Sequence, residues 1–254
     1  MTVRRGGARP PSRGSGTAPA TPDRHVARVE ISGGIGAGKT TLARALADAG
    51  PGFRFVGEEV RAVPFFAKFY AEPRTYAFEK NVSFLLSHAD RIRDAAREAA
   101  TSGPSALVCD FALFQDLAYA DVACAPDDLG AVEAVHDRMA ARVGRPTLLL
   151  HLSCSPDTQL SRIARRGRPE EAGIGRSYLS ALCAAVDRRR AELLRAVPDL
   201  PVVELDTDAP GWAENGGDAT GIRERVLAAL DDARRRPAPV APVGPVAPAV
   251  GKAQ

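Results

Sequence analysis

Eight consecutive residues near the start of the chain have the types and the spacing of a loop that binds phosphate. Residues 33–40 read Gly-Gly-Ile-Gly-Ala-Gly-Lys-Thr and match the pattern G-x-x-x-x-G-K-[ST]. Glycines let successive backbone N–H groups turn toward phosphate oxygens, where a side chain would collide. The ammonium of Lys39 adds charge for the β- and γ-phosphates, and the hydroxyl of Thr40 is a ligand for Mg²⁺. The residues expected to hold a nucleoside triphosphate are Gly33, Gly34, Ile35, Gly36, Ala37, Gly38, Lys39, Thr40 and Thr41.

A carboxylate follows the third apolar run of the chain. Asp110 comes directly after residues 106–109 and is expected to hold the metal ion, directly or through water, opposite Thr40. The plainer interpretation is that Asp110 caps a helix after the strand. The chain has no N-K-x-D motif for reading guanine, which argues against a GTPase. A glycine-rich turn without a ligand is disfavoured, because all eight positions of the loop and both flanking elements fit.

The hydrophobic pattern predicts the elements that bring these groups together. Short apolar runs suit strands buried on both faces of a parallel sheet, and they are residues 26–31, 53–56, 106–109, 148–152 and 202–205. Helical patterns lie between them, at residues 40–46, 78–92, 157–166, 178–194 and 222–230. The predicted fold class is α/β, a P-loop NTPase three-layer sandwich with a parallel sheet of about five strands and helices on both faces.

Composition predicts one folded unit between two ends of unusual sequence. Residues 1–25 mix Arg, Gly, Pro and Ser, residues 237–254 form a Pro-Ala-Val tract, and both are predicted to be disordered. Residues 26–236 then form a single domain. No run approaches the roughly 18 apolar residues of a membrane helix, and no apolar stretch follows the first charged residues. Neither a membrane span nor a secretory signal is therefore expected.

Charge and cysteine content exclude further classes. Residues 1–28 carry a net charge of +5 and residues 29–254 carry −2, so the predicted domain lacks the basic face of a nucleic-acid-binding protein. The four cysteines are widely spaced and form no C-x-x-C pair, which argues against a disulfide framework or a zinc site. We therefore expect a cytoplasmic protein that binds neither nucleic acid nor a membrane.

Three further segments of the chain resemble the deoxynucleoside kinase family, which includes deoxycytidine, deoxyguanosine and deoxyadenosine kinases. That family reads E-P-V-x-x-N-P-[FY]-L-x-x-F-Y after its second strand, and residues 58–70 read EEVRAVPFFAKFY. It continues P-x-R-W-A-F with a glutamine three residues later, and residues 73–78 read PRTYAF, followed by Asn81. Its lid pattern, R-I-x-x-R-G-R-x-E-E-x-G-I, fits residues 162–174 at every fixed position. The resemblance covers nearly the whole predicted domain.

The resemblance implies ATP- and Mg²⁺-dependent phosphoryl transfer to a nucleoside hydroxyl, with the 5′-hydroxyl as the first expectation. Glu58 matches the carboxylate that takes the proton from this hydroxyl, while Tyr70 and Glu171 match the pair that binds the sugar 3′-hydroxyl. Three arginines match those of the lid that closes over the triphosphate. The expected catalytic residues are therefore Glu58, Lys39, Arg162, Arg166 and Arg168. Family members also form dimers through the long helices after the second strand, which implies a homodimer through residues 73–100.

Plainer roles remain open for these residues. Glu58 could be an exposed acid at a strand end, Tyr70 a core residue with a solvated hydroxyl, and Glu171 a surface partner for arginine. The arginines of residues 162–168 could form a solvated helix face.

The acceptor side departs from the family pattern, whereas the phosphate side keeps it. The third-strand motif [DE]-R-S is Asp-Phe-Ala here, so Phe111 replaces the arginine that normally pairs with the catalytic carboxylate. Without this charge the ionised form of Glu58 is less favoured. Either another arginine enters the site, with Arg61 and Arg176 the nearest by motif, or the acceptor group lies elsewhere.

Departures extend to the predicted base pocket. The base-reading glutamine is shortened to Asn81, and Lys80 stands where an apolar residue usually lines the pocket. His88 stands where pyrimidine-preferring relatives carry arginine, and Asp116 keeps the acidic partner, although a lone histidine can also be packed without a role. We therefore expect an altered acceptor, such as a modified nucleoside. A kinase for a non-nucleoside alcohol or sugar and a catalytically inactive nucleotide-binding regulatory protein are the alternatives.

Overall fold

The centre of the structure is a parallel sheet of five strands in the order β2-β3-β1-β4-β5. The computed structural model describes residues 26–102, 106–208, 212 and 218–235, and the predicted disordered ends, 1–25 and 237–254, lie outside the described residues. The strands are β1 (Ala27–Gly33), β2 (Phe53–Val56), β3 (Ala106–Cys109), β4 (Leu148–Ser153) and β5 (Val202–Asp206). Each coincides closely with a strand predicted from the sequence, so these five predictions are confirmed.

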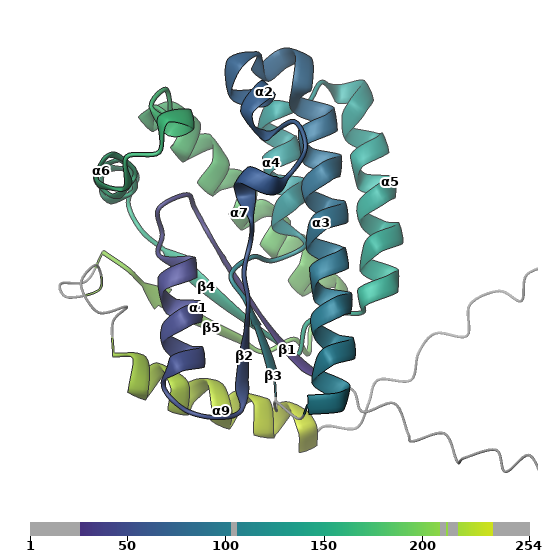
Figure 1. Cartoon of the computed structure of the whole chain (residues 1–254), viewed down its shortest axis with the longest axis vertical. Helices are drawn as coiled ribbons and strands as arrows, with labels where there is room; N and C mark the ends of the chain where they lie inside the picture. Colours follow the sequence, from purple (N-terminus) through teal and green to yellow (C-terminus); the bar gives the residue numbers. More distant parts are fainter. Residues whose placement is uncertain (1–25, 103–105, 209–211, 213–217, 236–254) are drawn as a thin grey trace, which may run out of the picture.

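Helices cover both faces of this sheet (Figure 1). One face carries α1 (Lys39–Asp48) and α9 (Ala219–Arg235). The other carries α3 (Pro73–Ser102), α4 (Gln115–Ala123) and α7 (Arg176–Ala196), with α5 (Pro126–Val143) packed on α3 and α4. The remaining elements are α2 (Phe66–Ala71), α6 (Pro156–Arg166) and the 3₁₀ segments η1 (Val60–Ala62) and η2 (Pro169–Glu171). The predicted three-layer α/β sandwich is confirmed. Among the described residues, no helix is both long and apolar enough to span a membrane.

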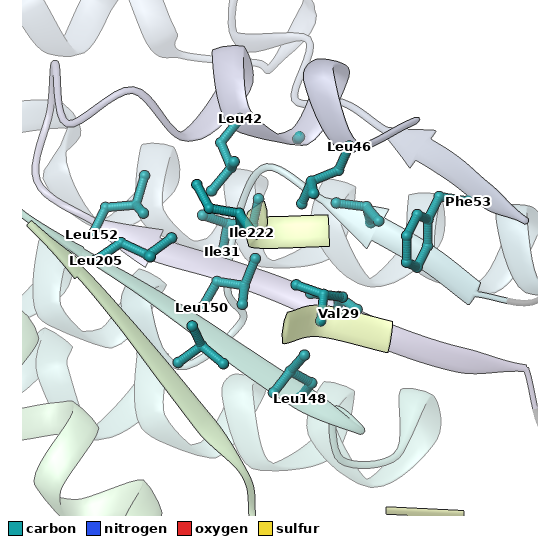
Figure 2. Close-up of a cluster of buried hydrophobic side chains, with 14 of the residues drawn as sticks. Val29, Ile31, Leu42, Leu46, Phe53, Leu148, Leu150, Leu152, Leu205 and Ile222 are labelled. Atoms are coloured by element: carbon teal, nitrogen blue, oxygen red, sulfur yellow. The ribbon is translucent and has the colours of Figure 1, made fainter. Parts of the chain in front are cut away.

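Side chains alternate between the two faces of the sheet, and this alternation builds a separate core on each side. Val29 and Ile31 of β1 pack against Leu42 of α1 and Ile222 of α9 (Figure 2). Leu149 of β4 points to the opposite face, into the cluster formed with α4 and α7. Burying a side chain of this size contributes about 1.5–3 kcal/mol. Both helical layers are therefore held by apolar contacts with strands that are buried on each face.

The central strand β1 also carries a buried ion pair. The Nε of Arg28 lies 2.8 Å from Oε1 of Glu30, and its other two nitrogens donate to the carbonyls of Val143 at 2.7 Å and Gly144 at 2.6 Å. The second carboxylate oxygen of Glu30 accepts the backbone N–H of Leu113 at 3.1 Å. Because each charge is paired and hydrogen-bonded, the pair ties β1 to the end of α5 and to the turn that precedes α4.

All five strands end at the same edge of the sheet, because all of them are parallel. Gly33 ends β1, Glu58 lies two residues beyond β2, Asp110 directly follows β3 and Thr207 directly follows β5. Open parallel sheets bind their ligands at this carboxyl edge. The fold thus brings the predicted phosphate loop and both predicted carboxylates to one side of the molecule.

Candidate active site

The loop between β1 and α1 has a backbone conformation that requires glycine. Gly33 and Gly38 have φ angles of +145° and +98°. A Cβ atom at Gly33 would lie 2.5 Å from the carbonyl oxygen of Leu152, and one at Gly38 would lie 2.8 Å from the indole Nε1 of Trp212. Both glycines are therefore needed for space as well as for the backbone angle.

The side chain of Gln115, at the start of α4, fixes the beginning of this loop. Its Oε1 accepts the backbone N–H of Gly33 at 2.9 Å, and its Nε2 donates to the carbonyl of Gly33 at 3.0 Å. The Nζ of Lys39 donates to the carbonyls of Gly33 at 2.9 Å and Gly34 at 3.1 Å, so the lysine lies over the loop. Burial is the main cause that lowers the pKa of Lys39, and two nearby carboxylates act in the opposite direction.

A single cleft of about 520 Å³ contains most residues that the sequence predicts for the site. The predicted residues that line it are Ile35, Gly36, Gly38, Lys39, Thr40, Thr41, Glu58, Tyr70, Asn81, His88, Asp110, Asp116, Arg162, Arg166, Arg168 and Glu171. Gly33, Gly34 and Ala37 belong to the phosphate loop but do not line the cleft. The donor half and the acceptor half, predicted from distant parts of the sequence, thus share one cavity.

Glu58 and Asp110 lie side by side where β2 and β3 end. The backbone N–H of Glu58 donates to Oδ1 of Asp110 at 2.8 Å, and the hydroxyl of Thr40 hydrogen-bonds to the same carboxyl group. Burial raises the pKa of Asp110, and the bond from Thr40 opposes this effect. Burial would also raise the pKa of Glu58, but the hydrogen bond and charge of His88, with the charge of Lys39, hold it below its usual value.

Thr40 and Asp110 together offer oxygen ligands for a metal ion at the start of α1. Among the described residues, no cluster of three or more His, Cys, Asp or Glu side chains could hold a metal ion by itself. Mg²⁺ commonly takes one or two carboxylates from the protein and completes its shell with water and substrate phosphates. One carboxylate and one hydroxyl beside a phosphate loop therefore fit Mg²⁺.

His88 lies between two carboxylates, at the side of the cleft where the sequence predicts the acceptor. Its Nδ1 is 2.8 Å from Oδ2 of Asp116, and its Nε2 is 3.1 Å from Oε1 of Glu58. Burial would lower the pKa of His88, but the charges and hydrogen bonds of the two carboxylates raise it to about 10. The ring is therefore an imidazolium at neutral pH, with both nitrogens donating.

Neither of the two arginines that sequence reasoning suggested replaces the missing arginine of the third strand. The side chain of Arg61 is 68% exposed and faces Glu170 at 3.5 Å. Arg176 pairs with Asp157, and its side chain is 59% exposed. Neither is among the described residues that line the cleft. The positive charge beside Glu58 comes from a histidine of α3 instead.

Two arginines of the predicted lid, Arg162 and Arg166, reach the cleft from α6, and the third, Arg168, directly precedes η2. Nε of Arg166 donates to Oε2 of Glu171 at 3.1 Å, and Nη1 of Arg168 lies 3.3 Å from its Oε1. Arg162 instead donates to the carbonyl of Gly36 at 3.2 Å, so it is already bonded to the phosphate loop. Three guanidinium groups thus lie near the place where a triphosphate would sit.

Tyr70 lines the same cleft as Glu171, as expected for a pair that binds a sugar hydroxyl. The ring of Tyr70 packs edge-on against Phe66 and Phe69, with ring centres 5.1 Å and 5.3 Å away. Burial raises the pKa of Tyr70, and the charge of Glu171 contributes to the rise. The carboxylate of Glu171 bonds to arginine and also lines the cavity, but the residue is only 4% exposed, so it is a buried partner of the arginines and not a surface one.

The amide of Asn81 is engaged within the protein. Its Nδ2 donates to the carbonyl of Ala77 at 2.8 Å and lies 3.4 Å from Sγ of Cys124, while its Oδ1 accepts from Nζ of Lys80 at 3.0 Å. Asn81 therefore lines the cleft without an unused amide hydrogen, and Lys80 is the polar group that it supports.

Several polar residues of the cleft escaped prediction from the sequence. Arg44 lies one helical turn beyond Thr40 on α1, so helix periodicity could have identified it. Trp212, whose indole lies against Gly38 of the phosphate loop, belongs to no sequence motif, so no sequence pattern could have identified it. The polar lining residues that sequence reasoning did not single out are Arg44, Gln115, Tyr119, Arg165, Tyr178 and Trp212.

Comparison with known proteins identifies curated proteins that are similar to this chain in sequence. A curated deoxyguanosine kinase of Bacillus subtilis (strain 168) is 28% identical over 198 residues, which cover 78% of this chain and 95% of the relative. A deoxyadenosine kinase of Dictyostelium discoideum is 27% identical over 170 residues, which cover 67% of this chain and 69% of the relative. Both names refer to the transfer of phosphate to a deoxynucleoside.

A solved structure is similar in fold. The structure of deoxyadenosine kinase from M. mycoides with bound dCTP aligns with a TM-score of 0.61 at 20% identity, over 81% of this chain and 99% of that one. The sequence model of the deoxynucleoside kinase family matches residues 29–227, which include the phosphate loop, both carboxylates and the lid. The resemblance seen in the sequence motifs is therefore confirmed, and this chain belongs to the deoxynucleoside kinase family.

Proposed function

We propose that this nucleoside kinase transfers the γ-phosphoryl group of ATP, with Mg²⁺, to the 5′-hydroxyl of a nucleoside, deoxynucleoside or modified nucleoside. Family membership makes the chain a nucleoside kinase with a nucleotide as phosphate donor. The main observation in favour of ATP as donor and a 5′-hydroxyl as acceptor is that Lys39 of the phosphate loop and Glu58 line the same cleft. A hydroxyl held beside Glu58 can therefore reach a phosphate held on the loop.

The proposed chemical step is an in-line displacement at phosphorus. The 5′-oxygen forms a bond to the γ-phosphorus, the bond from that phosphorus to the bridging oxygen of ADP breaks, and the hydroxyl proton passes to Glu58. A carboxylate is a weak base toward an alcohol, but this proton moves late, so the position of the carboxylate matters more than its basicity. The ion pair with His88 supports this role, because it keeps Glu58 ionised before transfer.

The lid arginines supply charge to the transferring group. A planar guanidinium spreads its charge over several equatorial oxygens of a loose transition state. In the structure Arg166 and Arg168 bond to Glu171, so we propose that a triphosphate draws them away from this carboxylate as the lid closes. Arg162 needs less movement, since it already contacts the loop at Gly36.

Thr40 and Asp110 are the residues that would hold Mg²⁺. When bound, the ion neutralises negative charge that develops between the β- and γ-phosphates. The hydrogen bond between Asp110 and the backbone of Glu58 supports the assignment, because it keeps the acidic ligand next to the acceptor carboxylate.

The test is release of ADP from ATP with a panel of natural and modified nucleosides. We expect nucleoside-dependent turnover that disappears in Lys39→Ala. Glu58→Gln should lower kcat by about a hundredfold or more, the usual scale for a positioned proton acceptor, with little change in nucleotide affinity. Glu59→Gln is the matched control, because that neighbouring carboxylate is 69% exposed and pairs with Arg91.

Absence of turnover with every nucleoside would contradict the proposed substrate class, and an unchanged kcat in Glu58→Gln would move the proton acceptor elsewhere. No observation on the described residues favours a kinase for a non-nucleoside alcohol or an inactive regulatory protein.

The homodimer, the cytoplasmic location and the single domain over residues 26–236 stay predictions. The exposed Leu86 on α3, 47% accessible, is compatible with a dimer through this helix. All four cysteines are free thiols in the structure, which supports a reducing compartment.

A further inference from the structure

Lys80 places a buried positive charge at the acceptor side of the cleft. The residue is only 7% exposed, yet it lines the cavity. Its Nζ lies 4.7 Å, 5.3 Å and 4.9 Å from the ring centres of Phe69, Phe84 and Tyr119, which come from three different helices. Aromatic faces stabilise a cation, but they offer it no oxygen as a hydrogen-bond acceptor.

The hydrogen bonding of this ammonium is incomplete within the protein. Among the described residues, the acceptor found for it is Oδ1 of Asn81, 3.0 Å away, and no carboxylate forms an ion pair with it. An ammonium has three N–H donors. Burial of a charge without such partners is costly, so the site favours a ligand that brings an acceptor.

The polar groups around Lys80 are already used. Both ring nitrogens of His88 are bonded, one to Asp116 and one to Glu58. The amide nitrogen of Asn81 donates to the protein. Lys80 is therefore the cation at this end of the described cleft that keeps donors for a substrate.

We propose that Lys80 donates a hydrogen bond to an exocyclic keto oxygen of the acceptor base, so that the enzyme prefers nucleosides with an oxo-substituted base over their amino-substituted counterparts. This inference rests on the proposed function, because it assumes a nucleoside in the cleft. The relatives do not indicate whether an oxo-substituted or an amino-substituted base is preferred, since their names include both a deoxyguanosine kinase and a deoxyadenosine kinase.

The preference follows from what each base offers to a buried ammonium. A keto oxygen accepts a charge-assisted hydrogen bond, which is stronger than a neutral one. An amino group at the same place presents its own N–H donors, so the substrate offers the donors of Lys80 no acceptor there. Sites built around a hydrogen bond discriminate strongly against a ligand that leaves their buried polar groups unpaired.

The experiment compares two pairs of nucleosides that differ in this group: 2′-deoxyinosine against 2′-deoxyadenosine, and 2′-deoxyuridine against 2′-deoxycytidine. We expect kcat/KM of the wild-type enzyme to be about tenfold or more higher for the oxo member of at least one pair. Lys80→Met should bring that ratio to within about threefold of one, through a higher KM for the oxo nucleoside. The KM for ATP should stay unchanged, which a general loss of structure would not allow.

Lys68→Met is the matched control. The ammonium of Lys68 also lies over two aromatic rings, 5.5 Å from Phe65 and 5.4 Å from Tyr76, but Lys68 is not among the lining residues of the cleft. Its replacement should leave the oxo-to-amino ratio as in the wild type. The wild-type comparison needs no variant, so the proposal stays testable even if Lys80→Met does not fold.

Equal rates within both pairs, a preference for the amino members, or a Lys80→Met enzyme that keeps the wild-type ratio would each overturn the proposal. In all three cases turnover of nucleosides would still support the proposed function. Absence of turnover with all four compounds and with every other nucleoside would instead contradict the function itself.

Discussion

The imidazole of His88 stacks on the ring of Phe111, with the ring centres 4.0 Å apart and the planes 8° from parallel. Phe111 occupies the place where the family motif carries an arginine, and His88 carries the positive charge that this arginine would supply. Two residues thus take the place of one: the apolar ring of Phe111, two residues after β3, packs against the cationic ring of His88 from α3. The charge reaches Glu58 from a different element, and Glu58 stays ionised.

Replacing His88 should therefore impair catalysis more than binding of ATP. In His88→Ala we expect kcat to fall by about tenfold to a hundredfold, because Glu58 and Asp116 lose the cation between them. Adding Phe111→Arg to this variant should restore part of the loss, since the guanidinium returns from the family's own position into the space that the imidazole leaves. Steady-state kinetics of the single and double variants measure both effects.

His136→Ala is the control for this substitution. His136 lies on α5, where its Nδ1 faces Asp137 at 3.2 Å, outside the lining of the cleft. It should leave kcat unchanged. A double variant no faster than His88→Ala would show that the charge alone does not explain the role of His88.

The same ion pairs predict how stability depends on pH. The pKa of His88 is raised to about 10 in the folded protein, above its unfolded value of about 6.5. Below the unfolded pKa both states are protonated and the contribution is complete; it is lost as pH rises through the folded pKa. His88→Gln should thus lower the free energy of unfolding by about 3 kcal/mol at pH 6, because it leaves the buried Asp116 and the partly exposed Glu58 without their cation.

Urea denaturation of the wild type and His88→Gln between pH 6 and pH 10.5 measures this difference. The gap between the two proteins should be largest at about pH 6 and should narrow from about pH 6.5 toward pH 10. A gap that widens with pH would mean that His88 is neutral in the folded protein.

Much of this fold could be predicted because its signals are local. The five strands are continuous apolar runs, and the phosphate loop is a contiguous motif. Helix α4 escaped prediction because it is buried on most sides, including Gln115, Asp116 and Ala118, so no polar face alternates with an apolar one. Helix α5 escaped as well, although Pro126 at its first turn and Gly144 after its end are standard boundary residues.

The role of His88 could not be predicted in the same way. Its contact with Glu58 depends on the register of α3 against the end of β2, and no local pattern encodes that register. The sequence showed that the arginine of the third-strand motif is missing, but the candidates that it offered as a replacement were the arginines Arg61 and Arg176. An ionised Glu58 needs a nearby cation in place of the missing arginine, and the packing of α3 against the end of β2 shows that this cation is His88.

Gln115 should be important for ATP binding although it belongs to no predicted motif. Gln115→Leu removes both hydrogen bonds to Gly33 and leaves a buried N–H and a buried carbonyl with fewer partners. We expect a higher KM for ATP, by about tenfold, with the KM for the nucleoside nearly unchanged. Titration with ATP at saturating nucleoside measures this, and an equal rise in both KM values would contradict a role confined to the loop.

The buried charge of Lys80 should also make the free energy of unfolding depend on pH. Burial lowers the pKa of Lys80 to about 8, against the opposing charges of Asp116, Cys124 and Glu58. Between this value and the unfolded pKa of about 10.4, the unfolded chain holds a proton that the folded chain lacks, so the contribution of Lys80 to stability rises with pH in that window. Below about pH 8 the folded protein instead carries the full cost of a buried cation.

Lys80→Met, which removes that cost, should therefore be more stable than the wild type at pH 7, and its advantage should shrink from about pH 8 upward. Urea midpoints of both proteins at pH 7, 8.5 and 10 measure this change, and Lys68→Met should show none of it. The KM of the wild type for an oxo nucleoside should rise over the same range, because a neutral amine is a weaker donor than an ammonium. A variant that is less stable than the wild type at pH 7 would mean that the aromatic rings and Asn81 already satisfy the cation without a substrate.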